Sequence, residues 1–412
     1  MLNRLRNNDL FIRILFTMMM IALMELGRHI AIPFLDPQGM KDVLKENQLL
    51  QNLSTTTGGQ VNYPSLFSIG LAPYMTGMIM FQAIKLLDID SIKKMSEYQS
   101  GMTQRGITFV LACLQSFQLV YLVRQHITKS SYQIFGFDAN AVSALVILVT
   151  GSMLVAWMAD MTVDRGMGGA GILIFPGIFE AMPRSLINGQ GLGTGFLELT
   201  PTILIVFAIS VVVVLFSTLF LNKSELRIPL QRPMIENDFS ESYVPIKVLA
   251  AGGMPFMFSS ALFMIPGYIA TLGTNQSYAE FVSNYLNFNN PIGIAIYCGI
   301  IVLLGYAFSL MNFRPEDTAK TLKESGDYFF GVVPGKQTQS YLTKRLMVLS
   351  TFANIFFVVV IGAPLVIGMY IDGIANFSFV FSNILILVTI LDNILDQAKV
   401  LYLRTQYNLM EL

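Results

Sequence analysis

The chain has 412 residues, of which 54% are hydrophobic and 13% are charged, and its formal net charge is zero. Soluble domains carry about 25% charged residues, so this composition excludes an ordinary water-soluble surface and predicts that lipid surrounds much of the chain. A net charge of zero gives no general attraction to nucleic acid, and no nucleic-acid partner is expected.

Ten apolar segments are candidates for membrane-spanning helices, each of which needs about 20 mostly apolar residues. In chain order they cover Leu10–Leu26, Leu66–Leu87, Ile107–Val123, Ala141–Ala159, Ala170–Met182, Thr200–Leu221, Val248–Leu272, Pro291–Met311, Leu346–Ile371 and Phe377–Leu395. The fifth is short, and Gly and Pro residues mark its ends. The sequence therefore predicts an all-α polytopic membrane protein with ten transmembrane helices.

The positions of Lys and Arg predict the orientation of these helices, because loops on the cytosolic side of a membrane are rich in both. If the N-terminus lies in the cytosol, 20 of the 26 Lys and Arg residues fall in inner segments. A missed span would disturb this alternation. We therefore expect both termini in the cytosol.

The ten segments divide into five plus five, and an odd number per half would invert one half relative to the other. We expect residues 1–221 to hold helices one to five and the start of helix six. Residues 222–247 would form a cytosolic loop between the halves, and residues 248–412 would hold helices seven to ten with a cytosolic loop at 312–345. The second helix of each half has Gly three residues before Pro, at Gly70 and Pro73 and at Gly252 and Pro255. Such matched interruptions often line a conduit, although Gly and Pro are also common in ordinary membrane helices.

Ionisable residues are scarce in the middle of the predicted spans. Glu25, Asp160 and Glu180 fall at span ends, and Asp392 and Asp396 lie one turn apart toward the inner end of the last span. A secondary transporter with inverted repeats is the alternative function, but it would need charge near mid-membrane. The glycine-rich run from residue 166 to 171 lacks the Lys of a phosphate-binding loop. No nucleophile and base or metal-ligand spacing is present, so we expect no enzymatic activity, no cofactor and no metal.

Four motifs follow one another along the chain. They are Ile30-Ala31-Ile32-Pro33; Ser68-Ile69-Gly70-Leu71-Ala72-Pro73-Tyr74-Met75; Asp164-Arg165-Gly166-Met167-Gly168-Gly169-Ala170-Gly171; and Asn312-Phe313-Arg314-Pro315-Glu316 with Pro334-Gly335-Lys336. In this order they resemble the SecY family, the pore subunit of the Sec protein translocase, from about Arg13 to Tyr407. The resemblance implies an hourglass channel that passes unfolded secretory or membrane proteins across or into the bacterial cell membrane.

The resemblance also implies a constriction of apolar side chains. Matched position by position, this pore ring would consist of Leu71, Met75, Ile174, Ile178, Met257 and Leu391. A hydrophobic constriction disfavours water and ions but yields to a passing chain. For any one of these residues, packing against lipid or neighbouring helices is the plainer explanation.

Two further elements follow from the same resemblance. A plug segment would span about residues 48–65, with the small and polar run Ser54, Thr55, Thr56, Thr57, Gly58 and Gly59. A lateral gate between helices two and seven would open toward lipid for signal sequences. Its polar residues would be Thr76, Gln82, Gln115, Ser259 and Ser260.

The partners implied by the resemblance are small SecE-like and SecG-like membrane subunits, a SecA-type motor ATPase, signal-bearing preproteins and the lipid bilayer. Motor contacts would involve the inner loops, through Arg227, Arg314 and Lys336. The family has an Arg just before the Pro-Gly of the second loop, whereas this chain has Val333, which puts the transfer of motor contacts in doubt. This departure is typical of a divergent paralogue such as the accessory SecY of Gram-positive bacteria, and the sequence leaves both the housekeeping and the accessory form open.

Overall fold

The computed structural model describes residues 9–34, 65–86, 95–124, 127–128, 132–134, 137–188, 200–232, 242–259, 262–263, 266, 276–371 and 373–408. Most of these residues are helical, and six helices among them are long and apolar enough to cross a membrane. The prediction of a helical, multi-pass membrane protein is confirmed. Each of the ten predicted spans contains helix, but because only six meet the length and hydropathy of a full span, the count of ten stays a prediction.

The chain divides into two compact units. The first unit comprises residues 1–182 and 390–412, and the second comprises residues 183–389. Two helices contribute to both units: α9 (Phe175–Asn188) and α16 (Asn376–Asn408). The sequence-based division into halves at the loop 222–247 stays a prediction.

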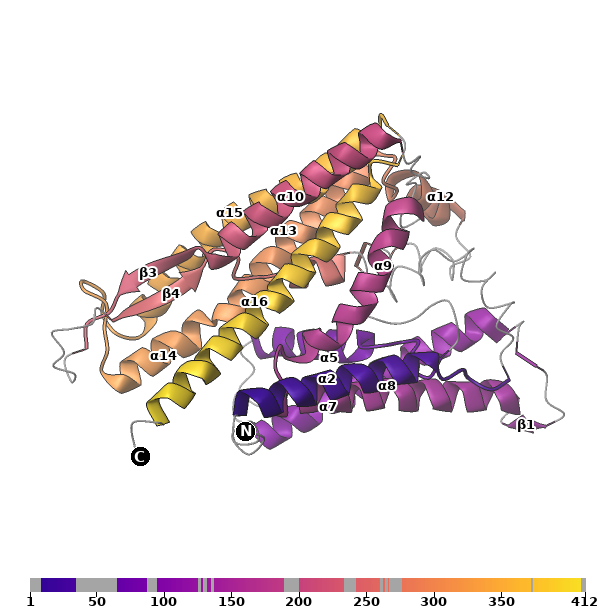
Figure 1. The fold of residues 1–412 in the computed structure, drawn as a ribbon, viewed down its shortest axis with the longest axis horizontal. Helices are drawn as coiled ribbons and strands as arrows, with labels where there is room; N and C mark the ends of the chain where they lie inside the picture. Colours follow the sequence, from indigo (N-terminus) through magenta and orange to yellow (C-terminus); the bar gives the residue numbers. More distant parts are fainter. Residues whose placement is uncertain are drawn as a thin grey trace. The chain divides into compact units, whose positions relative to one another are not determined.

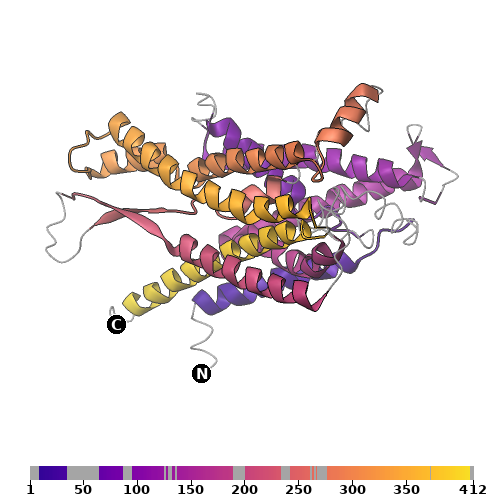
Figure 2. The ribbon, with the colours of Figure 1, turned by 90° about the horizontal axis from the view of Figure 1, so that it is seen from above.

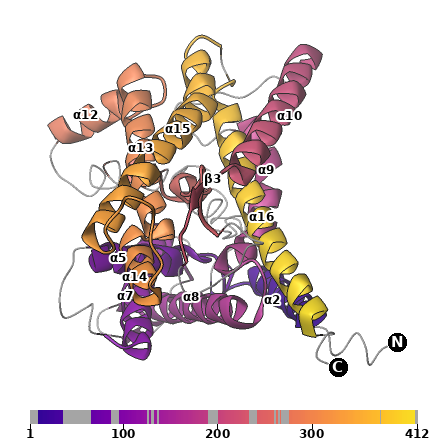
Figure 3. The same ribbon diagram turned by 90° about the vertical axis from the view of Figure 1, so that its left-hand side faces the viewer.

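The first unit is built on α2 (Asp9–His29), α5 (Ala72–Leu86), α7 (Glu97–Val123) and α8 (Ala139–Arg165), which pack alongside one another (Figure 1; Figure 3). Two glycines allow residues 65–71 to pass closely between α2 and α8. The Phe67 ring occupies the place of a side chain on Gly27, and the Leu66 carbonyl occupies the place of one on Gly151. The two-residue strands β1 (Gln133–Ile134) and β2 (Phe137–Asp138) pair antiparallel just before α8.

The second unit is organised around an antiparallel helix pair, α13 (Pro291–Phe313) and α15 (Lys336–Gly368) (Figure 3). Small residues let the two backbones approach, as is typical of helices packed in a membrane. The Asn354 side chain fills the space that a side chain on Gly305 would need, and it donates to the Val302 carbonyl over 3.3 Å. The Tyr306 and Thr351 hydroxyls share a hydrogen bond of 2.9 Å. This unit also contains the long helix α10 (Pro201–Lys223) and the short helix α12 (Gln276–Tyr285).

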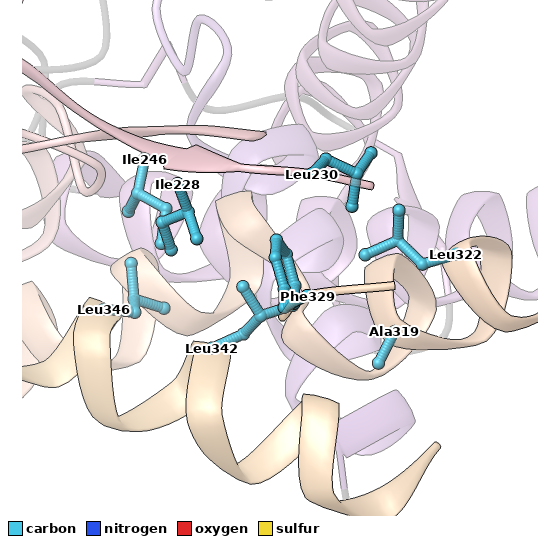
Figure 4. Close-up of a cluster of buried hydrophobic side chains, with 8 residues drawn as sticks. All are labelled: Ile228, Leu230, Ile246, Ala319, Leu322, Phe329, Leu342 and Leu346. Carbon is cyan, nitrogen blue, oxygen red and sulfur yellow. The ribbon is translucent and has the colours of Figure 1, made fainter. Parts of the chain in front are cut away.

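A loop module lies at one end of the α13–α15 pair (Figure 2). It consists of residues 225–232, 242–247 and 314–346, which include β3 (Glu225–Pro229), β4 (Tyr243–Lys247) and α14 (Pro315–Ser325). The strands pair antiparallel from Glu225 opposite Lys247 to Pro229 opposite Tyr243. Figure 4 shows the apolar core that joins the module: Ile228, Leu230, Ile246, Ala319, Leu322, Phe329, Leu342 and Leu346. Two loops that the sequence places about 70 residues apart therefore form one packed body.

Candidate functional site

The two Gly-Pro interruptions adopt the same backbone turn. Gly70 has φ 61° and Gly252 has φ 59°, a left-handed conformation that favours glycine. The Gly70 amide donates to the Phe67 carbonyl over 2.9 Å, and the Gly252 amide donates to the Leu249 carbonyl over 3.0 Å. A helix begins shortly after each turn, at Ala72 in the first unit and at residue 254 in the second. Proline in the first helical turn needs no hydrogen-bond acceptor there, so each motif ends a turn and starts a helix.

The glycine-rich run after α8 forms a tight turn that starts the fifth predicted span. Gly168 and Gly169 have φ of 85° and 65°. The turn is held from two sides of the first unit. The Thr17 hydroxyl of α2 accepts from the Met167 amide over 2.9 Å, and the Gln397 side chain of α16 accepts from the Gly168 amide over 2.8 Å. A short 3₁₀ helix, η2 (Ala170–Ile174), follows and leads directly into α9.

Five of the six predicted pore-ring residues are buried: Leu71, Met75, Ile174, Ile178 and Met257. The first four belong to the first unit, and Met257 belongs to the second. They come from the starts of the interrupted helices, since Leu71 closes the Gly70 turn and Ile174 ends η2. The glycine turns therefore place these buried apolar side chains near the beginning of helices. That all six close one ring stays a prediction.

Leu391 differs from the other ring candidates because its side chain is 45% exposed. Several buried apolar residues of α16 come shortly before it, namely Ile384, Leu385, Ile386, Val388 and Ile390. Leu385 is 1% exposed, and Ile386 packs directly on Gly253. Matching positions along a single sequence does not show which face of a helix is enclosed. The sequence analysis therefore did not single out these buried residues of α16.

The predicted gate residues have different surroundings in the described part of the chain. The Thr76 hydroxyl donates to the Ala72 carbonyl of its own helix over 2.8 Å. Ser259 is fully buried, and its hydroxyl lies 3.2 Å from the Tyr297 hydroxyl of α13. Gln115 is half-buried on α7. The Gln82 side chain, Ser260 and the plug residues 54–59 lie outside the described residues.

Helix seven begins in an aromatic cluster of the second unit. Phe263 stacks on Phe288 with ring centroids 4.9 Å apart, and both rings contact Tyr297 edge-on. Phe256 meets Phe357 of α15 edge-on at 4.7 Å. Aromatic pairs in these arrangements add stability beyond their buried area, so the described part of helix seven is anchored to α13 and α15.

The three acidic residues at span ends all form ion pairs within the first unit. Arg28 of α2 is 3% exposed, and its guanidinium lies 3.0 Å from Glu25 and 3.2 Å from Glu180 of α9. Asp160 of α8 pairs with Arg105 of α7 at 3.0 Å. Among the described residues, no group of three or more His, Cys, Asp or Glu could hold a metal ion. Glu180 and Asp160 therefore connect different helices, whereas Glu25 pairs within α2.

The three predicted motor-contact residues lie on the loop module and are exposed. Arg227 donates to Glu225 over 2.8 Å and covers the Tyr243 ring at 4.7 Å, and the hydrogen bond to Glu225 raises the pKa of the Arg227 guanidinium. Arg314 joins α13 to α14 with a left-handed φ of 48°, which is uncommon for a residue with a side chain. Lys336 is the first residue of α15.

The loop from residue 326 to 335 carries exposed apolar side chains beside these charges. Phe330 is 88% exposed and Val333 is 61% exposed, whereas the neighbouring Phe329 is buried in the module core. Backbone hydrogen bonds in both directions between Tyr328 and Gln231 tie this loop to the β3–β4 hairpin. The module therefore presents a mixed apolar and basic surface on a fixed backbone.

These features define a class: a multi-pass helical membrane protein whose glycine turns bring apolar residues to the starts of interrupted helices. The sequence profile of the SecY family matches residues 65–395. The chain belongs to the SecY family.

Known relatives agree with this assignment along most of the chain. The accessory Sec system protein translocase subunit SecY2 of Leuconostoc gelidum subsp. gasicomitatum is 27% identical over 403 residues, which cover 96% of each chain. The protein translocase subunit SecY of Lactococcus lactis subsp. cremoris is 28% identical over 379 residues, covering 84% of this chain and 83% of the relative. A solved protein-conducting channel superposes with a TM-score of 0.60 at 14% identity, over 94% of this chain and 91% of the channel. The predicted family and fold are confirmed.

Proposed function

We propose that this chain is the pore subunit of a bacterial protein translocase, which passes unfolded secretory or membrane proteins across or into the cytoplasmic membrane. The observation that carries this proposal is the burial of Leu71, Met75, Ile174 and Ile178 at the starts of interrupted helices in a member of the SecY family. Apolar side chains at a constriction expel water and ions at rest. Because contacts between apolar side chains are not directional, a translocating polypeptide can push these side chains apart.

The ring closes when Met257 and Leu391 join these four, and a lateral gate between helices two and seven admits signal sequences to lipid. The plug at residues 48–65 covers the ring from the outer side. Helix–helix hydrogen bonds in membranes average under about 1 kcal/mol, so an apolar signal helix supplies enough binding energy to part such a gate. A secondary transporter is not favoured, because Glu25, Asp160 and Glu180 are engaged in ion pairs.

Both termini lie in the cytosol in this proposal, since 20 of the 26 Lys and Arg residues then fall on the inner side. The loop module is then cytosolic, and its surface around Arg227, Arg314 and Lys336 receives a SecA-type motor. SecE-like and SecG-like subunits complete the translocon. Of the two forms, we favour the accessory one, because the relative named SecY2 is covered over 96% of its length and the housekeeping relative over 83%.

Reconstitution decides the function. The chain is purified with the membrane subunits that accompany it and placed in proteoliposomes with its cognate motor and ATP. We expect a signal-bearing preprotein to become protected from added protease, and the same preprotein without its signal to stay accessible. Accumulation of a small solute with no preprotein protection would contradict the proposal and favour the transporter.

A further inference from the structure

An ion-pair cluster in the first unit joins three helices through one carboxylate. Asp160 of α8 accepts from the Tyr74 hydroxyl of α5 over 3.0 Å at one oxygen. At the other oxygen it accepts from Arg105 of α7, whose Nε and Nη2 both lie 3.0 Å away. The guanidinium of arginine is planar and presents several N–H donors in fixed directions. Arg105 therefore orients the Asp160 carboxylate as well as neutralising its charge. The oxygen that meets Tyr74 is therefore held in place from the opposite side.

Tyr74 lies in the same helical turn as two ring candidates. Leu71, Tyr74 and Met75 stand at positions i, i+3 and i+4, which share one side of a helix. The Met75 amide donates to the Leu71 carbonyl over 3.0 Å, so the three residues form one helical turn. The direction of the Tyr74 side chain consequently sets the direction of its two neighbours.

The start of α5 is enclosed, since Leu71, Tyr74 and Met75 are all buried, whereas its backbone is less restrained. The turn before it is left-handed at Gly70, and Pro73 in the first helical turn lacks an amide hydrogen. The Thr76 hydroxyl is bonded to its own helix. Three residues after Tyr74, Gly77 packs against Thr108 of α7. Because apolar packing is not directional, the hydrogen bond between Tyr74 and Asp160 adds a directional restraint on the rotation of this turn.

We propose that Asp160, oriented by Arg105, is a positioning residue that keeps Leu71 and Met75 turned into the sealed arrangement through its hydrogen bond with Tyr74. Loosening this bond lets the first turn of α5 rotate, which opens the seal without removing any ring residue. The cluster thereby sets how strong a signal sequence must be to open the channel. This inference rests on the proposed channel function.

The test uses the full complex in proteoliposomes and two preproteins, one with an intact signal and one with a shortened apolar core. The readout is the ratio of export of the shortened signal to export of the intact signal, together with resting ion leak in planar bilayers. For Tyr74→Phe we expect both to rise about threefold, equivalent to ~0.6 kcal/mol for an average interhelical hydrogen bond in a membrane. Asp160→Asn should raise both further, because it also removes the charge that Arg105 meets.

The matched control is Tyr306→Phe, which removes the interhelical hydroxyl contact with Thr351 in the second unit. It should leave the export ratio and the leak at the wild-type values. A loss of folding stability lowers the export of both preproteins together, so it does not raise the ratio.

The outcomes separate this inference from the proposed function. If the wild-type complex exports the intact preprotein but Tyr74→Phe and Asp160→Asn keep the wild-type ratio and leak, the positioning role is wrong and the channel function stands. If the wild-type complex exports neither preprotein in the presence of motor and ATP, the channel function itself fails. Should Asp160→Asn not accumulate in the membrane, Tyr74→Phe decides alone, because it removes one hydroxyl and leaves the ion pair intact.

Discussion

Replacing Leu71 by Asn tests the apolar seal most directly. The Leu71 side chain is fully buried, so the substitution places an amide in an enclosed position. Burying such an amide costs about 1–3 kcal/mol on the scale of protein mutations, whereas a hydrated pore imposes no such cost. A shift of about 2 kcal/mol toward the hydrated state raises its population roughly 30-fold. We therefore expect a resting ion leak in planar bilayers and export of proteins with weak signals.

The control is Leu71→Met, which keeps the site apolar and changes its volume little, so it should leak no more than the wild type. Leu391→Asn provides a comparison within the predicted ring. Because Leu391 is 45% exposed, its substitution should raise the leak much less than Leu71→Asn does. Equal conductance for Leu71→Asn and Leu71→Met, at equal expression, would refute the assignment of Leu71 to the seal.

Three further predictions concern the packing of helix seven, the motor surface and the gate. Gly253→Ala would bring a methyl group to 2.7 Å from the α16 backbone. The overpacking should cost about 1–3 kcal/mol of folding stability and so lower the melting temperature in detergent. Gly299→Ala, whose methyl group would meet open space, is the control, and equal melting temperatures of the two variants would contradict the packing of Gly253 on α16. Arg314→Glu should weaken motor binding, more so at low salt than at high salt, and Arg314→Gly, which fits the φ of 48°, should weaken it less. If both variants bind the motor with unchanged affinity at low salt, Arg314 shapes the turn between α13 and α14 but does not contact the motor. Cysteines at Thr76 and Ser260, with both native cysteines replaced, should crosslink and block export, and full export through the crosslinked channel would contradict the gate.

Hydropathy along the sequence located the helices well because a membrane acts on each segment locally. Every span predicted from about 20 apolar residues contains helix, and the Gly-Pro motifs at Gly70 and Gly252 mark the turns where two of them begin. Glycine and proline act on the backbone of their own neighbourhood, so their spacing alone indicates a turn followed by a helix. The family was recognisable for the same reason, since its motifs are local.

Which side of each helix is enclosed was decided only by the tertiary structure. The family resemblance puts Leu71 and Leu391 in one ring, which stays a prediction. Only the structure shows that Leu71 is fully buried whereas Leu391 is 45% exposed. The sequence also placed Asp160 and Glu180 at span ends without their partners. Arg28 and Glu180 are 152 residues apart, and Arg105 and Asp160 are 55 residues apart. No residue pattern near either member of these ion pairs indicates its partner.

The loop module shows the same division between local and distant information. Its two segments were predicted from the sequence as separate polar loops, identified by their charges. Ile228 and Ile246 from the first segment and Phe329 and Leu342 from the second pack into one apolar core. Isolated apolar residues in a polar loop carry no signal of their destination, because burial depends on what the rest of the chain brings beside them. The sequence by itself determined the helices, their turns and the family, and only the tertiary structure determined which faces, charges and loops meet.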